Sequence, residues 1–172
     1  MNPDQLFSFI SRFFRYLLNK RSELDKLNFN DVLLTKVILD IHRTKKSSRF
    51  ESVNLYSLEP LHPIDRETAI AAMLERVKAV NANKELFVRR KLIDRELLAK
   101  YLPSISWIKA VSFGAGRYVS FEGNGRLEAL RRVFGKNNGI EVEVEVYYCK
   151  NTAKTIRRIN RVRRHNGLKA IA

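Results

Sequence analysis

The sequence predicts an α+β fold, a small mixed sheet with packed helices that is preceded by an N-terminal helical appendage. Three runs rich in β-branched and aromatic residues, at 106–113, 117–122 and 140–148, are bounded by turn formers and therefore predict strands. Apolar residues that recur at spacings of three and four predict the helices. With 172 residues, of which 45% are hydrophobic and 30% charged, the chain has the length and composition of a globular protein with a real core.

Two helices are expected in residues 1–49, which form the predicted appendage. The first runs from about Pro3 to Asn19, with aromatic residues on its apolar face and basic residues beside it. Such a helix either packs on the domain, which we favour, or lies on a membrane surface. The second spans about 30–43, where leucine, valine and isoleucine form its buried stripe.

The core domain is expected at residues 50–150, because the polar and basic stretch 44–49 is interpreted as a linker. A strand is predicted at 50–58, and a helix that Asp65 caps is predicted to run to about residue 80. A short helix at 94–102, which Pro103 ends, precedes the strands named above.

The turn that joins the strand at 117–122 to a helix at 127–134 has the composition of a phosphate site. It reads Glu122-Gly123-Asn124-Gly125-Arg126. Glycines permit positive φ and close approach, and the first N–H groups of a helix attract anions. Arg126 adds a guanidinium group that suits phosphate oxygens. The alternative is a structural turn whose arginine faces water.

The motifs around this turn resemble the ParB/sulfiredoxin superfamily in their order. Trp107-Ile108-Lys109 is followed by a glycine-containing hairpin, by Tyr118-Val119-Ser120-Phe121-Glu122, and then by Gly123-Asn124-Gly125-Arg126 with a short helix. In sulfiredoxin a W-I-K strand leads into a Y-S-F strand that ends in a G-x-x-R turn, and this turn marks the wider superfamily. The resemblance is good over 104–148 and loose over 53–148.

This resemblance implies a nucleotide site, with Lys109 and Arg126 at the phosphates and the backbone of 123–125 around them. The implied cofactors are ATP, or another nucleoside triphosphate, and Mg²⁺. Sulfiredoxin has cysteine and histidine inside the turn, where this chain has Asn124 and Gly125. The single cysteine, Cys149, lies beyond the last strand, so the turn lacks a thiolate nucleophile and peroxiredoxin repair is not expected.

Glu122, Glu59 and Asp65, together with Arg126, are the candidate catalytic residues. Glu122 belongs to the turn itself. Glu59 and Asp65 flank a proline-containing turn, and in the free-serine kinases of the superfamily the corresponding turn carries the catalytic carboxylate. The choice between Glu59 and Asp65 stays open, and Asp65 has the alternative role of a helix cap. No protein-only metal site is expected, since no histidines and cysteines have ligand spacing.

Positive charge gathers at the two ends of the chain, whose net charge is +15. Residues 151–172 hold seven basic and no acidic residues, within a basic C-terminal helix expected at 152–164. Such a helix suits sequence-independent contact with DNA phosphates, and a solvated charged helix is the alternative. The candidates for DNA contact are Arg157, Arg158, Arg161, Arg163 and Arg164.

Taken together, these features predict a nucleotide-binding, DNA-interacting protein. The resemblance implies an ATPase, which we favour over a non-catalytic protein, and metal-dependent DNase activity is a further option that it leaves open. The implied role is that of the plasmid fertility-inhibition (oncogenic-suppression) factors, which block DNA transfer. One alternative is a non-catalytic, nucleotide-gated DNA-binding or membrane-associated adaptor that resembles the partition proteins, and another is a small-molecule kinase. A cytoplasmic location is expected, with peripheral contact to the inner membrane through the first helix as a variant. Oligomeric state and the choice among DNA, RNA and anionic lipid stay open.

Overall fold

The computed structural model describes residues 29–171, and the structural statements below concern that part of the chain. The helix predicted near Pro3–Asn19 lies outside it. In chain order the elements are α3 (Phe29–Thr44), β1 (Lys45–Asn54), η1 (Leu55–Ser57), β2 (Leu58–Pro60), α4 (Glu67–Ala82), α5 (Lys84–Arg90), β3 (Leu92–Ile93), α6 (Arg95–Tyr101), β4 (Lys109–Ser112), β5 (Tyr118–Glu122), α7 (Asn124–Val133), η2 (Lys136–Asn138), β6 (Glu141–Cys149) and α8 (Thr152–His165).

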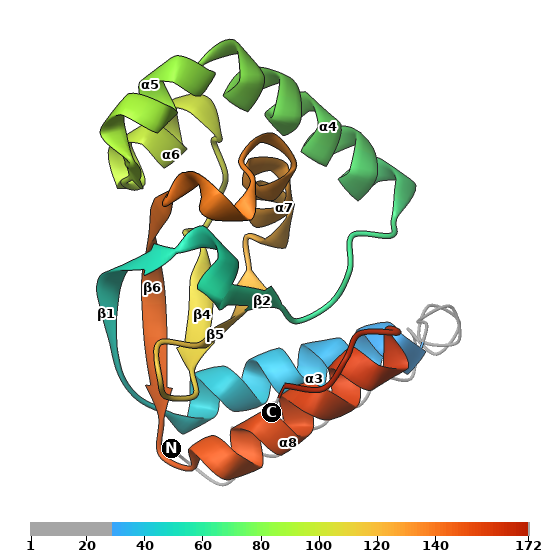
Figure 1. Ribbon diagram of the computed structural model, residues 1–172. Coiled ribbons are helices and arrows are strands. Elements are labelled where there is room, and N and C mark those ends of the chain that lie inside the picture. The colour runs from blue at the N-terminus through green and yellow to red at the C-terminus, as the bar shows by residue number, and fades with distance from the viewer. Residues whose placement is uncertain (1–28, 172) are drawn as a thin grey trace, which may run out of the picture.

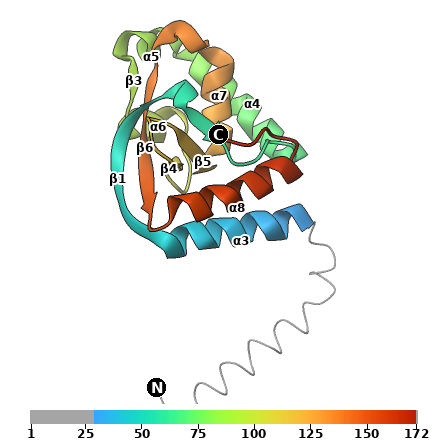
Figure 2. The same cartoon turned by 60° about the horizontal axis from the view of Figure 1, so that its bottom comes forward.

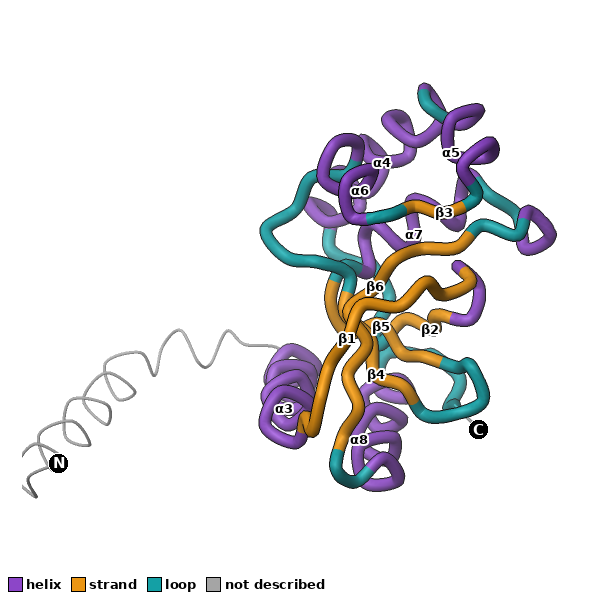
Figure 3. Tube along the Cα trace, turned by 90° about the vertical axis from the view of Figure 1, so that its left-hand side faces the viewer, coloured by secondary structure: helices purple, strands orange, loops and turns teal. Residues whose placement is uncertain are grey.

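The strands form one mixed sheet, so the predicted α+β class is confirmed (Figure 3). Its order is β1-β6-β4-β5-β2, and β3 pairs with β6 as well. The pairs β1–β6 and β4–β5 are antiparallel, whereas β6–β4, β5–β2 and β3–β6 are parallel. β6 therefore has neighbours on both sides, and the strand predicted at 140–148 is an interior strand of the sheet.

Helices cover both faces of this sheet. The helices α4 to α7 gather on one side, and α3 and α8 lie side by side on the other (Figure 1, Figure 2). Alternate residues of one strand enter two different cores, as period-two geometry requires. Ala110 and Val146 belong to the core beneath α4 to α7, whereas Val111 and Tyr147 belong to the core beneath α3 and α8.

The expected linker at 44–49 is a strand instead, because β1 pairs with β6 from Lys45 to Asn54. The domain boundary expected at residue 49 thus falls inside β1. Nor is the C-terminal helix an appendage, since Ile159 and Val162 of α8 are fully buried in the same core as Ile41 of α3. The ends of the chain that the structure describes are parts of the packed fold.

A side-chain cap begins one of the two helices for which the sequence offers an aspartate at the start, and does not begin the other. Asp94 caps α6 as its side chain accepts a hydrogen bond from the Leu97 N–H at 2.9 Å. Asp65 does not cap α4, which begins two residues later with Arg66 at the N-cap position. No helix in the range 29–171 is long and apolar enough to cross a bilayer.

A candidate anion-binding cleft

A cleft of about 640 Å³ opens where α3, the segment 62–66, α4 and the N-terminus of α7 meet. The predicted phosphate turn lies on its wall, because Gly123, Asn124, Gly125 and Arg126 all line it. No residue of α8 itself lines the cleft. Asn166, the residue that follows the last residue of α8, does. The turn singled out from the sequence therefore does border a cavity.

Gly123 holds the turn in a conformation that favours glycine. Its φ is +81°, and a Cβ at this position would lie 2.9 Å from Cγ1 of Ile108 and 3.0 Å from Nη2 of Arg126. The Gly123 carbonyl accepts the N–H groups of Arg126 and Leu127 at 3.0 and 3.1 Å. The N–H groups of Asn124 and Gly125 come earlier in the helix, where the helix itself offers no acceptor. Those two donors and the positive end of the α7 dipole suit an anion.

Arg126 is buried, and the protein offers its guanidinium group few hydrogen-bond acceptors. Only 3% of the residue is exposed, one nitrogen donates to the Ser106 carbonyl, and Nε has no hydrogen-bond partner. Burial and the nearby Arg76 charge lower the pKa of Arg126 to about 10, against the opposing effect of Glu122. The site therefore holds a cation whose charge the surrounding protein stabilises poorly.

Arg76, from α4, brings a second guanidinium group to the same cleft. Its Nη1 would lie 3.0 Å from a Cβ at position 125, so it sits directly against the turn. Within residues 29–171 neither Arg76 nor Arg126 forms an ion pair with a carboxylate. Two like charges that face one cavity repel each other and attract an anion.

Sequence reasoning missed Arg76, although the sequence contains a signal for it. The residue follows the buried Met73 by three positions and precedes the buried Val80 by four. It therefore lies on or beside the inward face of α4, where an unpaired arginine is unusual.

Asn124 is buried and its side chain is unsatisfied. The residue is 7% exposed, and neither Nδ2 nor Oδ1 has a hydrogen-bond partner. Leaving a buried polar group unpaired costs about 1–3 kcal/mol, so such groups in a native fold call for a partner that is not a protein atom. The residue lines the cleft and a second cavity beside it, while its amide atoms are buried.

Lys109 and Glu122 pair with each other and do not line the cleft. The Lys109 Nζ lies 2.9 Å from Oε2 of Glu122, and Nε2 of His42 lies 3.4 Å from Oε1. Burial alone would raise the pKa of Glu122, but Lys109, Ser106 and His42 together outweigh it and lower the pKa. The ammonium group that the resemblance implies at the phosphates is thus neutralised beside the cleft.

The two remaining candidate carboxylates occupy different places. Asp65 is exposed and lines the cleft, whereas Glu59 lines neither the cleft nor its neighbour and pairs with Arg163 at 3.3 Å. Among the described residues no group of three histidine, cysteine, aspartate or glutamate side chains is placed to hold a metal. Asp65 fits Mg²⁺ that is bound chiefly by phosphate oxygens, because Mg²⁺ in such sites takes only one or two carboxylates.

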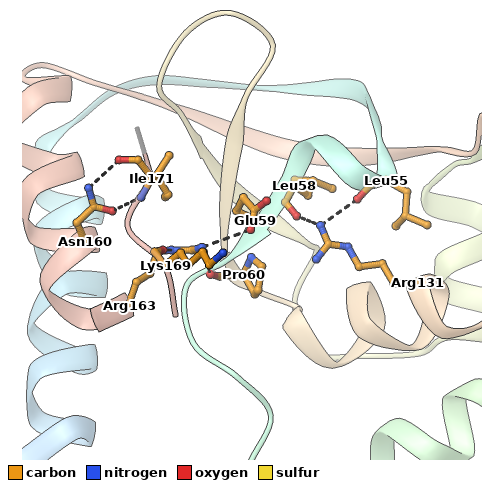
Figure 4. A network of polar contacts seen from close by, with 9 residues as sticks. All are labelled: Leu55, Leu58, Glu59, Pro60, Arg131, Asn160, Arg163, Lys169 and Ile171. Carbon is orange, nitrogen blue, oxygen red and sulfur yellow. Dashed lines mark hydrogen bonds and ion pairs between the residues drawn. The ribbon is translucent and has the colours of Figure 1, made fainter. Parts of the chain in front are cut away.

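The arginines of α8 divide into structural and exposed residues. Arg163 is 4% exposed and binds the carbonyls of Pro60 and Lys169 as well as Glu59 (Figure 4). Arg158 pairs with Asp40 of α3 at 2.6 Å. The exposed members of the predicted DNA-binding set are Arg157, Arg161 and Arg164.

Comparison with known proteins adds no relative from which a role might be transferred. No family model matches the chain. Comparison with curated proteins and with solved structures also gave no match. The resemblance to the ParB/sulfiredoxin superfamily and the plasmid role that it implies therefore stay predictions, and the functional argument is built on the geometry of the cleft.

Proposed function

We propose that this chain binds a nucleoside triphosphate, with the phosphates in the cleft at the N-terminus of α7. The observation that carries the proposal is the pair of guanidinium groups, Arg76 and Arg126, that border this cleft without a carboxylate partner in residues 29–171. A row of phosphoryl groups offers several negative charges and many acceptor oxygens. Those match two guanidinium groups and the N–H groups of Asn124 and Gly125.

Hydrolysis of the terminal phosphoryl group is the reaction that this arrangement favours. Arg76 and Arg126 would stabilise the charge on the transferring phosphoryl oxygens, which is the main task of a protein in phosphoryl transfer. Asp65 would hold Mg²⁺ or orient the attacking water. Mg²⁺, when bound, would neutralise charge on the phosphates. The reaction needs no nucleophilic side chain, in keeping with a turn that lacks cysteine.

Calorimetric titration of the full chain with Mg-ATP and with inorganic tripolyphosphate tests the binding site. Arg76→Ala and Arg126→Lys are each expected to weaken both ligands roughly tenfold or more, because hydrogen bonds to charged groups contribute about 1.5–3 kcal/mol. Arg90→Ala, which removes an exposed arginine at the end of α5, is the matched control and leaves both affinities unchanged.

Phosphate release under saturating Mg-ATP tests the reaction separately. Asp65→Asn is expected to reduce release while ATP still binds, since its carboxylate acts on metal or water and not on the base. Wild-type protein that binds neither ATP nor tripolyphosphate, or arginine variants that bind as tightly as wild type, would show that the cleft is not a phosphate site.

Contact with DNA phosphates is a second candidate function, and one observation on α8 favours it. Arg157, Arg161 and Arg164 are exposed and recur at spacings of four and three, so they share one face of the helix. This face points away from the core that Ile159 and Val162 enter. A row of exposed guanidinium groups suits a phosphate backbone without reading its sequence.

A further inference from the structure

A third arginine, Arg66, borders the same cleft as Arg76 and Arg126. It is the N-cap residue of α4, and Ala69 and Arg76 of that helix line the cleft with it. The N-terminus of α4 therefore lies at the cleft, as the N-terminus of α7 does, and both helix dipoles add positive potential there. Arg66, however, already has a carboxylate partner.

The partner of Arg66 is Asp31, in the first turn of α3, and Asp31 lines the cleft as well. Nη2 of Arg66 lies 2.5 Å from Oδ1 of Asp31. Because α3 and α4 cover opposite faces of the sheet (Figure 1), this ion pair joins the two helix layers at the cleft. Asp31 is thus an anion of the protein itself that occupies a cation of the candidate anion site.

The pair is exposed and therefore opens at little cost in free energy. The side chain of Arg66 is 65% exposed and that of Asp31 is 35% exposed. Water solvates both charges well when they are apart, so exposed ion pairs contribute little net stability. A phosphate group offers a guanidinium group charged oxygens in a bidentate geometry. A phosphate chain already held in the cleft can therefore draw Arg66 away from Asp31.

We propose that Arg66 is a third phosphate-binding residue and that Asp31 restrains it until the ligand binds. This rests on the proposed phosphate site, because the ligand that displaces Asp31 is the one that Arg76 and Arg126 hold. On binding, Arg66 exchanges the Asp31 carboxylate for phosphate oxygens. Asp31 is then an internal competitor, which lowers the affinity of the cleft for anions.

Calorimetric titration of the full chain with inorganic tripolyphosphate, without Mg²⁺, tests the competition. Asp31→Asn is expected to bind tripolyphosphate roughly threefold or more tightly than wild type, because Arg66 is released and a negative charge leaves the cleft. Arg66→Ala is expected to bind roughly threefold or more weakly. Glu67→Gln is the matched control, expected to stay within about twofold of wild type. It removes an exposed carboxylate of the first turn of α4 that does not line the cleft.

The double variant Asp31→Asn/Arg66→Ala separates the restraint on Arg66 from the simple loss of a negative charge. If Asp31 acts through Arg66, the gain from Asp31→Asn falls below about twofold once Arg66 is absent. A gain that persists at about twofold or more in the Arg66→Ala background would overturn the inference, because Asp31 would then act on the ligand directly.

The titration of wild-type protein distinguishes this inference from the proposed function. Tight binding of tripolyphosphate by wild type, together with unchanged affinity in Arg66→Ala and Asp31→Asn, would contradict the role of Arg66 alone. Absence of binding by wild type and by Asp31→Asn would contradict the phosphate site, and the restraint with it.

Discussion

At the scale of single residues, Gly123 is the position where the cleft depends on the absence of a side chain. Alanine there combines an unfavourable φ of +81° with contacts of 2.9 to 3.0 Å to Ile108 and Arg126. We expect Gly123→Ala to lower the free energy of unfolding by about 1–3 kcal/mol and to weaken anion binding. Urea denaturation of the full chain measures the first effect.

Gly135→Ala is the control for this change. Gly135 has a φ of −73°, and a Cβ there meets nothing within 4 Å. Its substitution is therefore expected to leave stability unchanged or slightly increased, since alanine restricts the unfolded chain. Equal denaturation midpoints for the two variants would contradict the account of the turn.

Glu122 predicts a specific acid sensitivity. Its partners lower its pKa below the ordinary value of 4.5 despite the opposing effect of burial, so the folded state favours the ionised carboxylate. The resulting stability is complete above the ordinary value and is lost as pH falls through the lower, folded pKa. Glu122→Gln should unfold more easily at neutral pH and lose less stability on acidification below about pH 4.5.

Thermal unfolding over a pH series measures this difference. Glu75→Gln, which changes a solvent-exposed partner of Lys78 on α4, serves as the control and is expected to follow the wild-type curve. If Glu122→Gln and wild type lose stability in parallel as the pH falls, the pairing with Lys109 and His42 does not stabilise the fold.

At the scale of elements, α8 offers the test of DNA contact. Alanine at Arg157, Arg161 and Arg164 removes three exposed charges, and each phosphate contact contributes about 0.9 to the slope of log affinity against log salt. We expect the slope for duplex DNA to fall by roughly three in the triple variant, with the fold intact. Fluorescence anisotropy over a salt series measures it.

The control for α8 replaces Arg89 and Arg90, two exposed arginines at the end of α5. It removes charge from another surface and is expected to leave most of the slope in place. A slope that is unchanged in the triple variant would remove α8 from the interface. Arg163 is not part of this test, because it is itself buried and its loss would remove the donor to the Pro60 and Lys169 carbonyls and destabilise the fold.

Elements whose pattern is local were predicted well from the sequence. The helices predicted at 30–43 and 152–164 match α3 and α8, and the strand predicted at 140–148 matches β6. Residues 44–49 were misread because a basic, polar stretch has no strand signal of its own, and only pairing with β6 makes it one. The two-residue strand β3 was missed for the same reason, because it too is a strand only through its pairing with β6.

The site was predictable only where a turn carries its own signature. Residues 123–126 line the cleft as expected, because glycines before a helix specify a local geometry. Lys109 was expected there too, but its partner Glu122 comes from the neighbouring strand. Spacing from Met73 and Val80 places Arg76 beside the inward face of α4. Its approach to the turn depends in addition on how α4 packs against α7, which spacing alone does not encode.

At the scale of the whole molecule, the two cores share one sheet, so neither half has a sheet of its own. Phe87 of α5 is fully buried in the core between the sheet and α4 to α7. Ile159 of α8 is fully buried in the core between the sheet and the pair α3 and α8. We expect alanine at either position to lower the free energy of unfolding by about 2–5 kcal/mol. In both variants the far-UV circular dichroism and the fluorescence of Trp107, the single tryptophan, are expected to report the same midpoint.

Leu39→Ala is the control, because Leu39 is 63% exposed on α3 and its loss should change stability by no more than about 0.5 kcal/mol. The decisive outcome is the shape of the Ile159→Ala transition. If α3 and α8 were an appendage, this variant would lose them in a separate, earlier step while the Trp107 signal kept its wild-type midpoint. Val111, Val119 and Tyr147 face those helices from the strands that also carry the other core, so loss of the helices exposes the sheet and both signals move together.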